Sequence, residues 1–524
     1  MPDLAAYAPP PHVAQTWQVT KPAARGRRGI VVSQARAAAE VGVAVLEAGG
    51  NAADAAVAAA FALAAVEPWN SGLGGIGFAL VHPAGAARAQ VVDFGPVAPA
   101  GLDPAQFPLT GRATADGFGW PEVAGDRNLH GALSVAIPSA VAGYAALHAR
   151  FGRMPLPDLL APAIALARRG LPRDWYTTLQ IAANAATLRL YPESARIYLP
   201  GGLPPVPPYR GDPPCFVLGA LPATLERLRH AGLSDFYQGD LAASMAADIA
   251  EAGGVLSAGD LRACQARIVP ATEVPWRGRS VQYAGGLTAG PTLARVLARL
   301  PPAGAAPDAA WFAALAKTLL DAYAARLDGE GEGGCTTHLT VCDAEGGMVA
   351  LTSTLLSTMG SKLVLPGSGV LLNNGVMWFD PRPGRANSIA PGRRPLTNMC
   401  PVILRDDGGA PVLAAGASGG RRIPAAVAQM LAFVSDFGMD PQAAAHHPRI
   451  DVSGPDAILA DRRLSGEVLA ALRAAGPTTT AEHGAQPINF ACPNLVLARP
   501  DGERVGVADA MSPWSAAVAE QGSR

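Results

Sequence analysis

The 524-residue chain is poor in several features that mark particular classes of protein. Only 16% of its residues are charged, and 41 Lys and Arg face 42 Asp and Glu, for a net charge of −1. The basic excess that a surface for nucleic acid or acidic membranes needs is therefore missing. The six cysteines include no C-x-x-C pair, which argues against a zinc ribbon or a thioredoxin-type site. They are also too sparse for a disulfide scaffold, so we expect reduced thiols.

Long hydrophobic runs are missing as well. The longest, Ala55–Val66, is far shorter than the roughly 20 residues that cross a bilayer. Residues 1–29 contain no apolar segment of the kind found in secretory signals, so we expect a cytoplasmic protein. Alanine, glycine and proline are abundant, and 49% of the residues are hydrophobic. This composition indicates a compact, enzyme-sized protein with a large core.

Local patterns predict helices and strands in both halves of the chain. Helices are expected near 35–48, 52–66, 154–170, 221–231, 425–437 and 466–475. Strands or hairpins are expected near 30–32, 78–82, 338–355, 411–415 and 494–509. Asn51 with Asp54 can cap the second helix, and Pro68 stops it. Helices mixed with hairpins indicate a layered α+β fold.

Two glycine-rich motifs have familiar patterns but unsuitable surroundings. Gly72–Gly77 matches the dinucleotide-binding fingerprint, yet a strand follows it where the fingerprint needs a helix, so a tight turn is the better interpretation. Gly416–Gly420 matches the G-x-S-x-G pattern of serine hydrolases, with His483 as one candidate base. Because Arg421, Arg422 and Pro424 follow directly, a glycine turn that offers backbone N–H groups fits at least as well.

A third segment, Gly331–Thr340, has a glycine tract that leads directly into a strand beginning with threonine. A threonine hydroxyl needs a neighbouring base to act as a nucleophile. If the chain is cut before Thr336, the freed α-amine lies beside that hydroxyl, and its ordinary pKa of about 7.7–8.0 suits a general base. Glycines permit the strained geometry of an N→O acyl shift. A linker before a strand is the simpler alternative.

Ordered matches between about residues 30 and 510 resemble the γ-glutamyltransferase family of N-terminal-nucleophile (Ntn) hydrolases. The matching segments are Val41–Ala56, Gly72–Phe78, Ile137–Gly143, Phe236–Gly239, Thr336–Thr340, Leu371–Asn374, Arg394–Leu396 and Gly416–Gly420. The resemblance implies a four-layer αββα sandwich formed by both parts of an autoprocessed chain. It also implies a cut between Cys335 and Thr336. The parts would be an N-terminal extension (1–29), a large subunit (30–335) and a small subunit (336–524).

The resemblance also assigns catalytic roles. Thr336 would attack an amide carbonyl to form an acyl-enzyme, and Thr354 would support its hydroxyl. Gly419 and Gly420 match the pair whose backbone N–H groups hold the oxyanion. Water or an amine would take the acyl group, and no metal or organic cofactor is implied. The expected partners are a small-molecule amide and the chain's own two subunits, which can pair as a homodimer of heterodimers, with no nucleic acid or membrane.

The chain departs from the family where the family binds the glutamate zwitterion. Gly95 stands in place of the arginine that holds the α-carboxylate, and Trp378 in place of the aspartate that holds the α-amine. The other substitutions are Leu356 for an asparagine, Gly375 for a glutamine or glutamate, and Thr397 and Asn398 for a serine pair. Losing two charged anchors should weaken γ-glutamyl binding by several kcal/mol.

These departures favour an amidohydrolase of small acyl amides, similar to the oxamate amidohydrolase branch of the family or to its cephalosporin-acylase branch. Oxamate carries a carboxylate, for which the candidate cations are Arg393, Arg394, Arg421 and Lys362. Two alternatives stay open. One is a genuine γ-glutamyltransferase or glutathione hydrolase with altered glutamate contacts, and the other is an uncleaved, inactive relative that acts as a binding protein.

Overall fold

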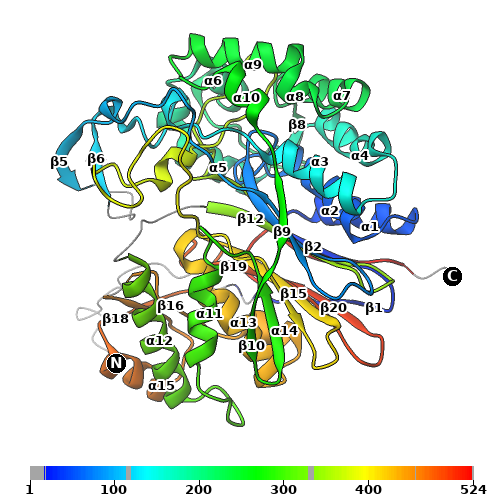
Figure 1. The fold of residues 1–524 in the computed structure, drawn as a ribbon, viewed down its shortest axis with the longest axis vertical. Coiled ribbons are helices and arrows are strands. Elements are labelled where there is room, and N and C mark those ends of the chain that lie inside the picture. The colour runs from blue at the N-terminus through cyan, green and yellow to red at the C-terminus, as the bar shows by residue number, and fades with distance from the viewer. Residues whose placement is uncertain (1–16, 18, 114–119, 328–334, 455, 522–524) are drawn as a thin grey trace, which may run out of the picture.

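The computed structural model describes residues 17, 19–113, 120–327, 335–454 and 456–521. Two seven-stranded sheets, here sheet A and sheet B, stack between two layers of helices (Figure 1). Sheet A contains, in spatial order, β1 (Ala24–Gly26), β20 (Arg504–Ala508), β19 (Cys492–Ala498), β15 (Pro411–Ser418), β14 (Val402–Arg405), β11 (Arg279–Tyr283) and β10 (Thr272–Trp276). Sheet B contains β21 (Ala516–Ala519), β2 (Ile30–Ser33), β12 (Cys335–Cys342), β13 (Met348–Leu356), β3 (Ile76–His82), β4 (Gln90–Phe94) and β9 (Arg267–Pro270).

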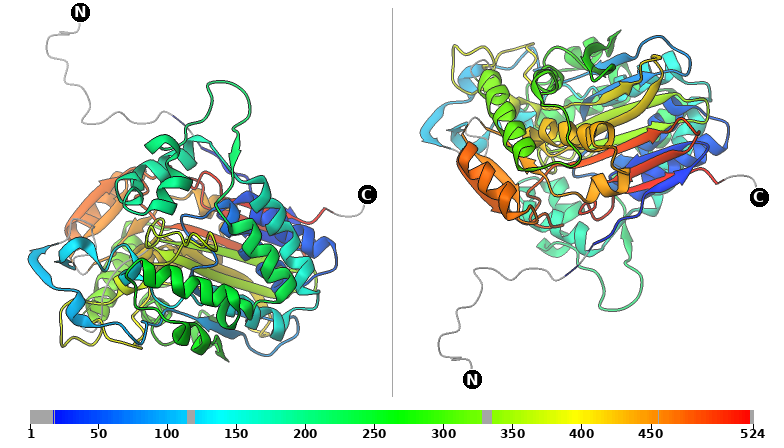
Figure 2. Two further views of the ribbon diagram at one scale, coloured as in Figure 1. Left: turned by 90° about the horizontal axis from the view of Figure 1, so that it is seen from above. Right: turned by 90° about the horizontal axis from the view of Figure 1, so that it is seen from below.

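The helices cover the two outer faces, as the views from above and below show (Figure 2). The sheet B side carries α1 (Arg36–Glu47), α2 (Ala52–Val66), α3 (Ala140–Phe151), α4 (Leu156–Arg169), α5 (Trp175–Leu188), α6 (Pro192–Tyr198), α7 (Leu221–Ala231), α8 (Asp235–Gln238), α9 (Asp240–Glu251) and α10 (Ala258–Ala263). The sheet A side carries α11 (Gly290–Arg299), α12 (Ala309–Leu327), α13 (Ile423–Leu431), α14 (Pro441–His446) and α15 (Gly466–Ala475).

The alternation of side chains along each strand produces the layers. In β2, Val31 packs with the helices outside sheet B, whereas Ile30 and Val32 pack between the two sheets. In β15, Leu413 packs against the helices outside sheet A, and Ala414 faces inward. Since both faces of both sheets are covered, apolar residues occupy both sets of alternate positions. The four-layer αββα arrangement is confirmed.

The motif Gly49–Asp54 caps the N-terminus of α2 and links this helix to another segment of the chain. The Asn51 side chain accepts hydrogen bonds from the N–H groups of Ala53 and Asp54 at 3.0 Å each, and Asp54 Oδ2 accepts from the Asn51 N–H at 3.0 Å. This reciprocal capping starts α2 as predicted. Asp54 Oδ1 also accepts from the N–H of Arg153 at 3.0 Å, which ties α2 to the segment before α4.

The glycine motifs are sites of close backbone approach. Gly72–Gly77 forms the turn from α2 into β3, in line with the tight-turn interpretation. A Cβ on Gly74 would lie 2.2 Å from the Leu371 carbonyl oxygen, and one on Gly416 would lie 2.2 Å from the ring of His338. No other residue fits at either position without displacing its neighbours.

Two further expectations from the sequence concern the cysteines and membrane-spanning helices. The five cysteines whose side chains the structure describes are free thiols, as expected. Within the described residues, no helix is both long and apolar enough to cross a membrane.

Candidate active site

Thr336 lies at the start of β12, beside an irregularity in the β12–β13 ladder. Cys335 pairs with Leu356, but Thr337 pairs with Ser353, so Thr336 faces the two residues Thr354 and Leu355. The register therefore brings Thr336 and Thr354 to neighbouring positions on paired strands, and the role of Thr354 stays a prediction. The Thr354 hydroxyl accepts the Leu356 N–H at 2.8 Å, which fixes its position. The glycines before Thr336, 331–334, lie outside the described residues.

Gly419 and Gly420 follow directly after β15. Their φ angles, 130° and 63°, belong to the region that favours glycine. A Cβ on Gly419 would lie 2.8 Å from the Ala491 Cα atom. Within the described chain, the N–H groups of Gly419 and Gly420 donate to no backbone carbonyl of a turn or loop. The turn can therefore present two backbone donors, and their role in holding an oxyanion stays a prediction.

Thr336 and Gly419 line one pocket that encloses about 660 Å³ of space, part of it open to solvent. Its walls come from the end of α2, from α5, from the loop 483–490 and from the turn 509–512. The lining residues are Gln34, Glu67, Asn70, Tyr176, Gln180, Thr336, Thr358, Ser418, Gly419, Arg422, His483, Gly484, Ile488, Phe490, Cys492, Asp509, Met511 and Ser512.

The positions that depart from the family pattern lie outside this wall. Trp378 and Leu356 are 1% and 0% exposed and pack between the sheets. Leu356 has φ of 86°, which is strained for leucine and easier for asparagine, the residue that the family places there. Gly375 is equally enclosed, because a Cβ there would lie 2.6 Å from that of Ala136. The side chains of Trp378 and Leu356 therefore fill space between the two sheets, whereas the sequence analysis placed these positions at the substrate.

The space that a side chain at position 95 would need is occupied by the guanidinium of Arg394. A Cβ on Gly95 would lie 2.6 Å from Nη2 of Arg394. Arg394 is bound to Asp93, with Nη1 2.9 Å from Oδ2, and Arg267 binds the same carboxylate at 2.5 Å. The cation beside Gly95 therefore already has a carboxylate partner.

Thr397 and Asn398 form hydrogen bonds with other parts of the chain and do not line the Thr336 pocket. The N–H of Thr397 donates to the Leu287 carbonyl at 2.9 Å. Nη2 of the buried Arg326 donates to the Thr397 carbonyl at 2.8 Å and to Asn398 Oδ1 at 3.1 Å. Both residues thus anchor the end of α12 to the segment that leads into β14.

The other three candidate cations of the sequence analysis, Lys362, Arg421 and Arg393, also donate hydrogen bonds within the chain. Lys362 Nζ donates to the hydroxyl of Ser357 and to the carbonyls of 358 and 360, at 2.7–3.0 Å. Arg421 donates to the Ser453 carbonyl at 2.7 Å, and Arg393 to the Ala386 carbonyl at 3.4 Å. None of these side chains is part of the Thr336 pocket wall.

Arg422, which the sequence analysis did not single out, does line the pocket. Its Nε donates to the Gly419 carbonyl at 3.2 Å and its Nη1 to the Ile488 carbonyl at 2.7 Å. Among the described residues, no carboxylate forms an ion pair with it. Its position two residues after Gly420 was the only available signal in the sequence.

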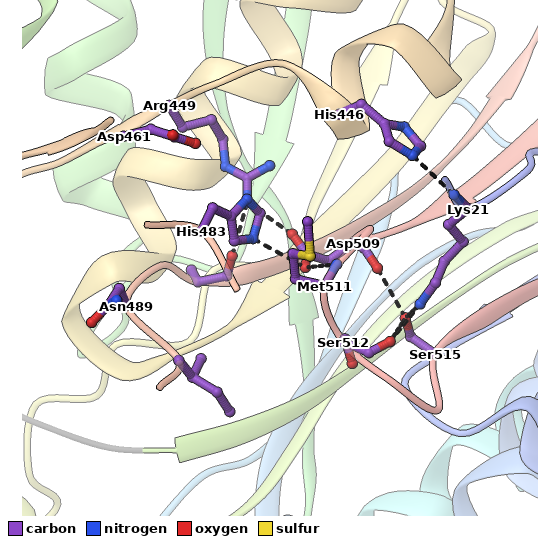
Figure 3. Close-up of polar contacts among 12 residues, drawn as sticks. Lys21, His446, Arg449, Asp461, His483, Asn489, Asp509, Met511, Ser512 and Ser515 are labelled. Atoms are coloured by element: carbon purple, nitrogen blue, oxygen red, sulfur yellow. Dashed lines mark hydrogen bonds and ion pairs between the residues drawn. The ribbon is translucent and has the colours of Figure 1, made fainter. Parts of the chain in front are cut away.

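His483 and Asp509 of the same wall belong to a buried ion-pair cluster with Arg449 (Figure 3). Asp509 Oδ1 is 3.4 Å from His483 Nε2, and Asp509 Oδ2 is 2.8 Å from Arg449 Nη2. Burial acts to raise the pKa of Asp509, but His483 and Arg449 outweigh it and hold that pKa well below its usual range. Asp509 therefore stays ionised and fixes the imidazole.

Ser418, the serine of the G-x-S-x-G motif, lines the pocket together with His483. Its hydroxyl accepts a hydrogen bond from the Gln34 amide, and no bond joins it to His483 in the part of the chain that the structure describes. A serine triad needs that bond between nucleophile and base. The contacts of Ser418 are therefore not those of a serine-triad nucleophile.

Glu67 is a pocket residue that the sequence analysis missed. It is 3% exposed, accepts the Thr337 hydroxyl at 2.5 Å, and accepts the Asn70 amide at 3.0 Å. Burial raises its pKa to about 7. A carboxyl group that follows the apolar run Ala55–Val66, directly before Pro68, was the signal available for it.

A family model described as gamma-glutamyltranspeptidase matches residues 38–308 and 309–519. The chain belongs to this family. It is 33% identical over 503 residues to the acylase ACY 1 proenzyme of Pseudomonas sp. (strain SE83), covering 86% of this chain and 87% of that protein. The glutathione hydrolase proenzyme of Escherichia coli K12 is 28% identical over 553 residues, covering 93% and 91%.

The solved structures give the same fold. The cephalosporin acylase of Bacillus halodurans superimposes over the whole of both chains with a TM-score of 0.82 at 22% identity. As a member of the gamma-glutamyltranspeptidase family, the chain is an Ntn-type hydrolase or acyltransferase. The relatives are named both as acylases and as glutathione hydrolases.

Proposed function

We propose that the chain is a proenzyme that cuts itself before Thr336 and then hydrolyses a small amide whose acyl group carries a carboxylate, as oxamate does. The observation that carries the proposal is Arg422, a cation without a carboxylate partner among the described residues, in the wall of the Thr336 pocket. The replacement of the family's glutamate anchors at Gly95 and Trp378 supports a smaller acyl group without an α-amine.

In the self-cleavage step, the Thr336 hydroxyl attacks the Cys335 carbonyl, the peptide C–N bond breaks, and an ester forms. Breaking that bond frees the Thr336 α-amine, which keeps the hydroxyl proton, and water then hydrolyses the ester to give the Cys335 carboxylate and the free Thr336 hydroxyl. In turnover, that amine takes the proton as the hydroxyl attacks the substrate carbonyl. The N–H groups of Gly419 and Gly420 stabilise the oxyanion, ammonia leaves with the proton, and water releases the acid.

Arg422 suits the carboxylate of such a substrate. A guanidinium binds a carboxylate through two parallel hydrogen bonds, which fixes orientation as well as charge. Two backbone carbonyls already hold Nε and Nη1, so the group is rigid before substrate arrives. The carbonyl of Gly419 is one of these acceptors, which ties the cation to the turn that is expected to hold the oxyanion.

The first experiment tests the cut. Intact-mass and denaturing-gel analysis of purified protein should show two fragments, 1–335 and 336–524, with threonine at the start of the second. The T336A variant should remain a single chain. The S418A variant should still be cut, because Ser418 has no role in the proposed step. An active, unbroken chain of 53.4 kDa would refute the proposal, as would cleavage of T336A at the same bond.

The second experiment tests the acyl group. Oxamate, acetamide and γ-glutamyl anilide are compared on the cleaved enzyme and on R422M and R422K. We expect oxamate to be preferred and R422M to raise its KM at least tenfold, while acetamide turnover changes little. R422K, a point charge without the fork geometry, should fall between. Efficient turnover of γ-glutamyl anilide alone would instead establish a γ-glutamyl enzyme with altered contacts.

A further inference from the structure

The segment before β1 lies outside the residues that the family model matches. Hydrogen bonds attach it to α14. The N–H of Lys21 donates to His446 Nε2 at 2.9 Å, and the N–H of Ala23 donates to Gln442 Oε1 at 2.9 Å. Strand β1 then pairs with β20, the strand that leads to Asp509. This part of the N-terminal extension is therefore fixed to α14 and sheet A.

The Lys21 ammonium extends from this segment to the turn 509–515 (Figure 3). Nζ donates to the Ser515 hydroxyl at 2.6 Å and to the Ser512 carbonyl. The Ser515 hydroxyl in turn donates to the Asp509 carbonyl at 3.2 Å. Asp509, Met511 and Ser512 of this turn line the Thr336 pocket. The Lys21 side chain thus bonds two residues of this turn directly and reaches Asp509 through Ser515.

Trp514 holds the opposite side of the same turn. Its indole N–H donates to Asp174 Oδ2 at 2.7 Å. Its ring centroid lies 5.0 Å from that of Trp69 and 5.6 Å from that of Tyr176, itself a pocket residue. The turn is therefore held between the Lys21 ammonium and an aromatic cluster, and Trp514 can report on its position.

We infer that Lys21 is a positioning residue whose positive charge holds the pocket wall 509–515 in place for the reaction at Thr336. Hydrogen bonds from a charged donor are roughly twice as strong as those between neutral groups. When Nζ loses its proton, the bonds to Ser512 and Ser515 weaken and the wall loosens. The inference rests on the proposed function only for its activity measurement.

The surroundings place this change in the mildly alkaline range. Burial lowers the pKa of Lys21 to about 8, and the negative charge of Asp509 limits that decrease. Cys492 also faces Lys21, but burial raises the pKa of its thiol far above neutrality, so it contributes no charge near pH 8. The other ionisable groups nearby are the His446 ring and, along the adjoining groove, Arg36, Arg169 and Asp174.

The experiment compares wild type with K21M, which keeps the apolar stem and removes the charge, from pH 6.5 to 10. Oxamate hydrolysis by wild type should exceed that by K21M about tenfold below pH 7.5, and the ratio should fall towards one above pH 8.5. K317M, at the exposed lysine of α12, is the matched control and should follow wild type throughout. A packing role alone would give a ratio that does not change with pH, and this result would overturn the inference.

Two further measurements keep the test decisive. If K21M does not fold, K21R, which stays charged to high pH, should keep its activity level to pH 10. If oxamate is not a substrate, the proposed function fails separately, and fluorescence tests the inference alone. The Trp514 signal, taken as wild type minus W514F, should change between pH 7 and 9.5 in wild type. The same signal should stay constant in K21M, measured as K21M minus K21M/W514F. An unchanged wild-type signal would overturn the inference.

Discussion

The two adjacent threonines at the start of β12 have different surroundings. Thr336 lines the pocket, while Thr337 donates its hydroxyl proton to the buried carboxyl of Glu67. Glu67 accepts a second hydrogen bond from Asn70, whose carbonyl accepts the Leu355 N–H at 2.8 Å. One carboxyl group therefore connects the end of α2 to both β12 and β13 at the point where the nucleophile is expected.

The cost of ionising Glu67 leads to a pH prediction. Its pKa is raised by burial from 4.5 to about 7 in the folded chain, so the unfolded chain releases this proton first as the pH rises. The contribution of Glu67 to stability is complete below pH 4.5 and is lost as the pH passes 7. E67Q, which is neutral throughout, should therefore become more stable than wild type by up to about 3 kcal/mol at pH 8.

Urea unfolding at pH 5 to 8 measures this difference in the T336A background, where we expect a single chain. E251Q, at an exposed glutamate that ends α9, is the control and should show no such trend. A difference between E67Q and the parent that stays constant with pH would mean that Glu67 is already ionised throughout this range.

Sequence reasoning proposed the candidate residues that depend on local pattern, and the structure brings two of them, Thr336 and Gly419, to one pocket. A glycine tract before Thr336 and paired glycines after an apolar strand can be read from the chain. Arg422 and Glu67 could not be assigned in this way, because contacts distant in sequence give them their roles: Arg422 with the 488 carbonyl, and Glu67 with Thr337. Likewise, nothing local shows that Lys362 already binds three acceptors.

At the scale of elements, the two sheets are in direct contact where β12 crosses β15. The ring of His338 lies against the bare backbone of Gly416, and its Nδ1 is 2.8 Å from the Thr352 hydroxyl. Burial lowers the pKa of His338 to about 3, so the ring is neutral at physiological pH. The first glycine of the G-x-S-x-G pattern thus serves sheet packing.

This contact predicts a coupled pair of substitutions. G416A places a methyl group 2.2 Å from the His338 ring and should destabilise the chain by about 1–3 kcal/mol. In an H338A background the space is open, so the same change should cost much less. Urea unfolding of the two single variants and the double variant, all built on T336A, gives the coupling energy.

G466A, at an open position on α15, is the control and should be nearly neutral. Equal effects of G416A in both backgrounds would show that the ring does not set the spacing of the sheets.

The elements with strong local signals were predicted well. The predicted helices 221–231 and 466–475 coincide with α7 and α15, and the predicted hairpins correspond to β12–β13 and β19–β20. Strand β9 is exposed along its length and β21 is half-buried, so neither has the alternation that marks a strand. Their pairing with β4 and β2 depends on partners far away in the chain.

At the scale of the whole molecule, both sheets combine strands from the two sides of the expected cut. In sheet B, β12 lies between β2 and β13, and β13 lies next to β3. In sheet A, β11 pairs with β14 and β1 pairs with β20. Separating chain 1–335 from chain 336–524 would therefore break backbone ladders inside both sheets and expose the core between them.

This interleaving leads to a prediction about the cleaved protein. In native buffer the two chains should elute together, as one species of about 53.4 kDa or a multiple of it, and they should separate only in denaturant. Because ladder hydrogen bonds and apolar burial hold them, 1 M salt should not release either chain, whereas an assembly held by surface ion pairs would weaken. Recovery of a folded 336–524 chain alone in native buffer would contradict the strand order, since its sheet B strands β12 and β13 would lack β2 and β3 beside them.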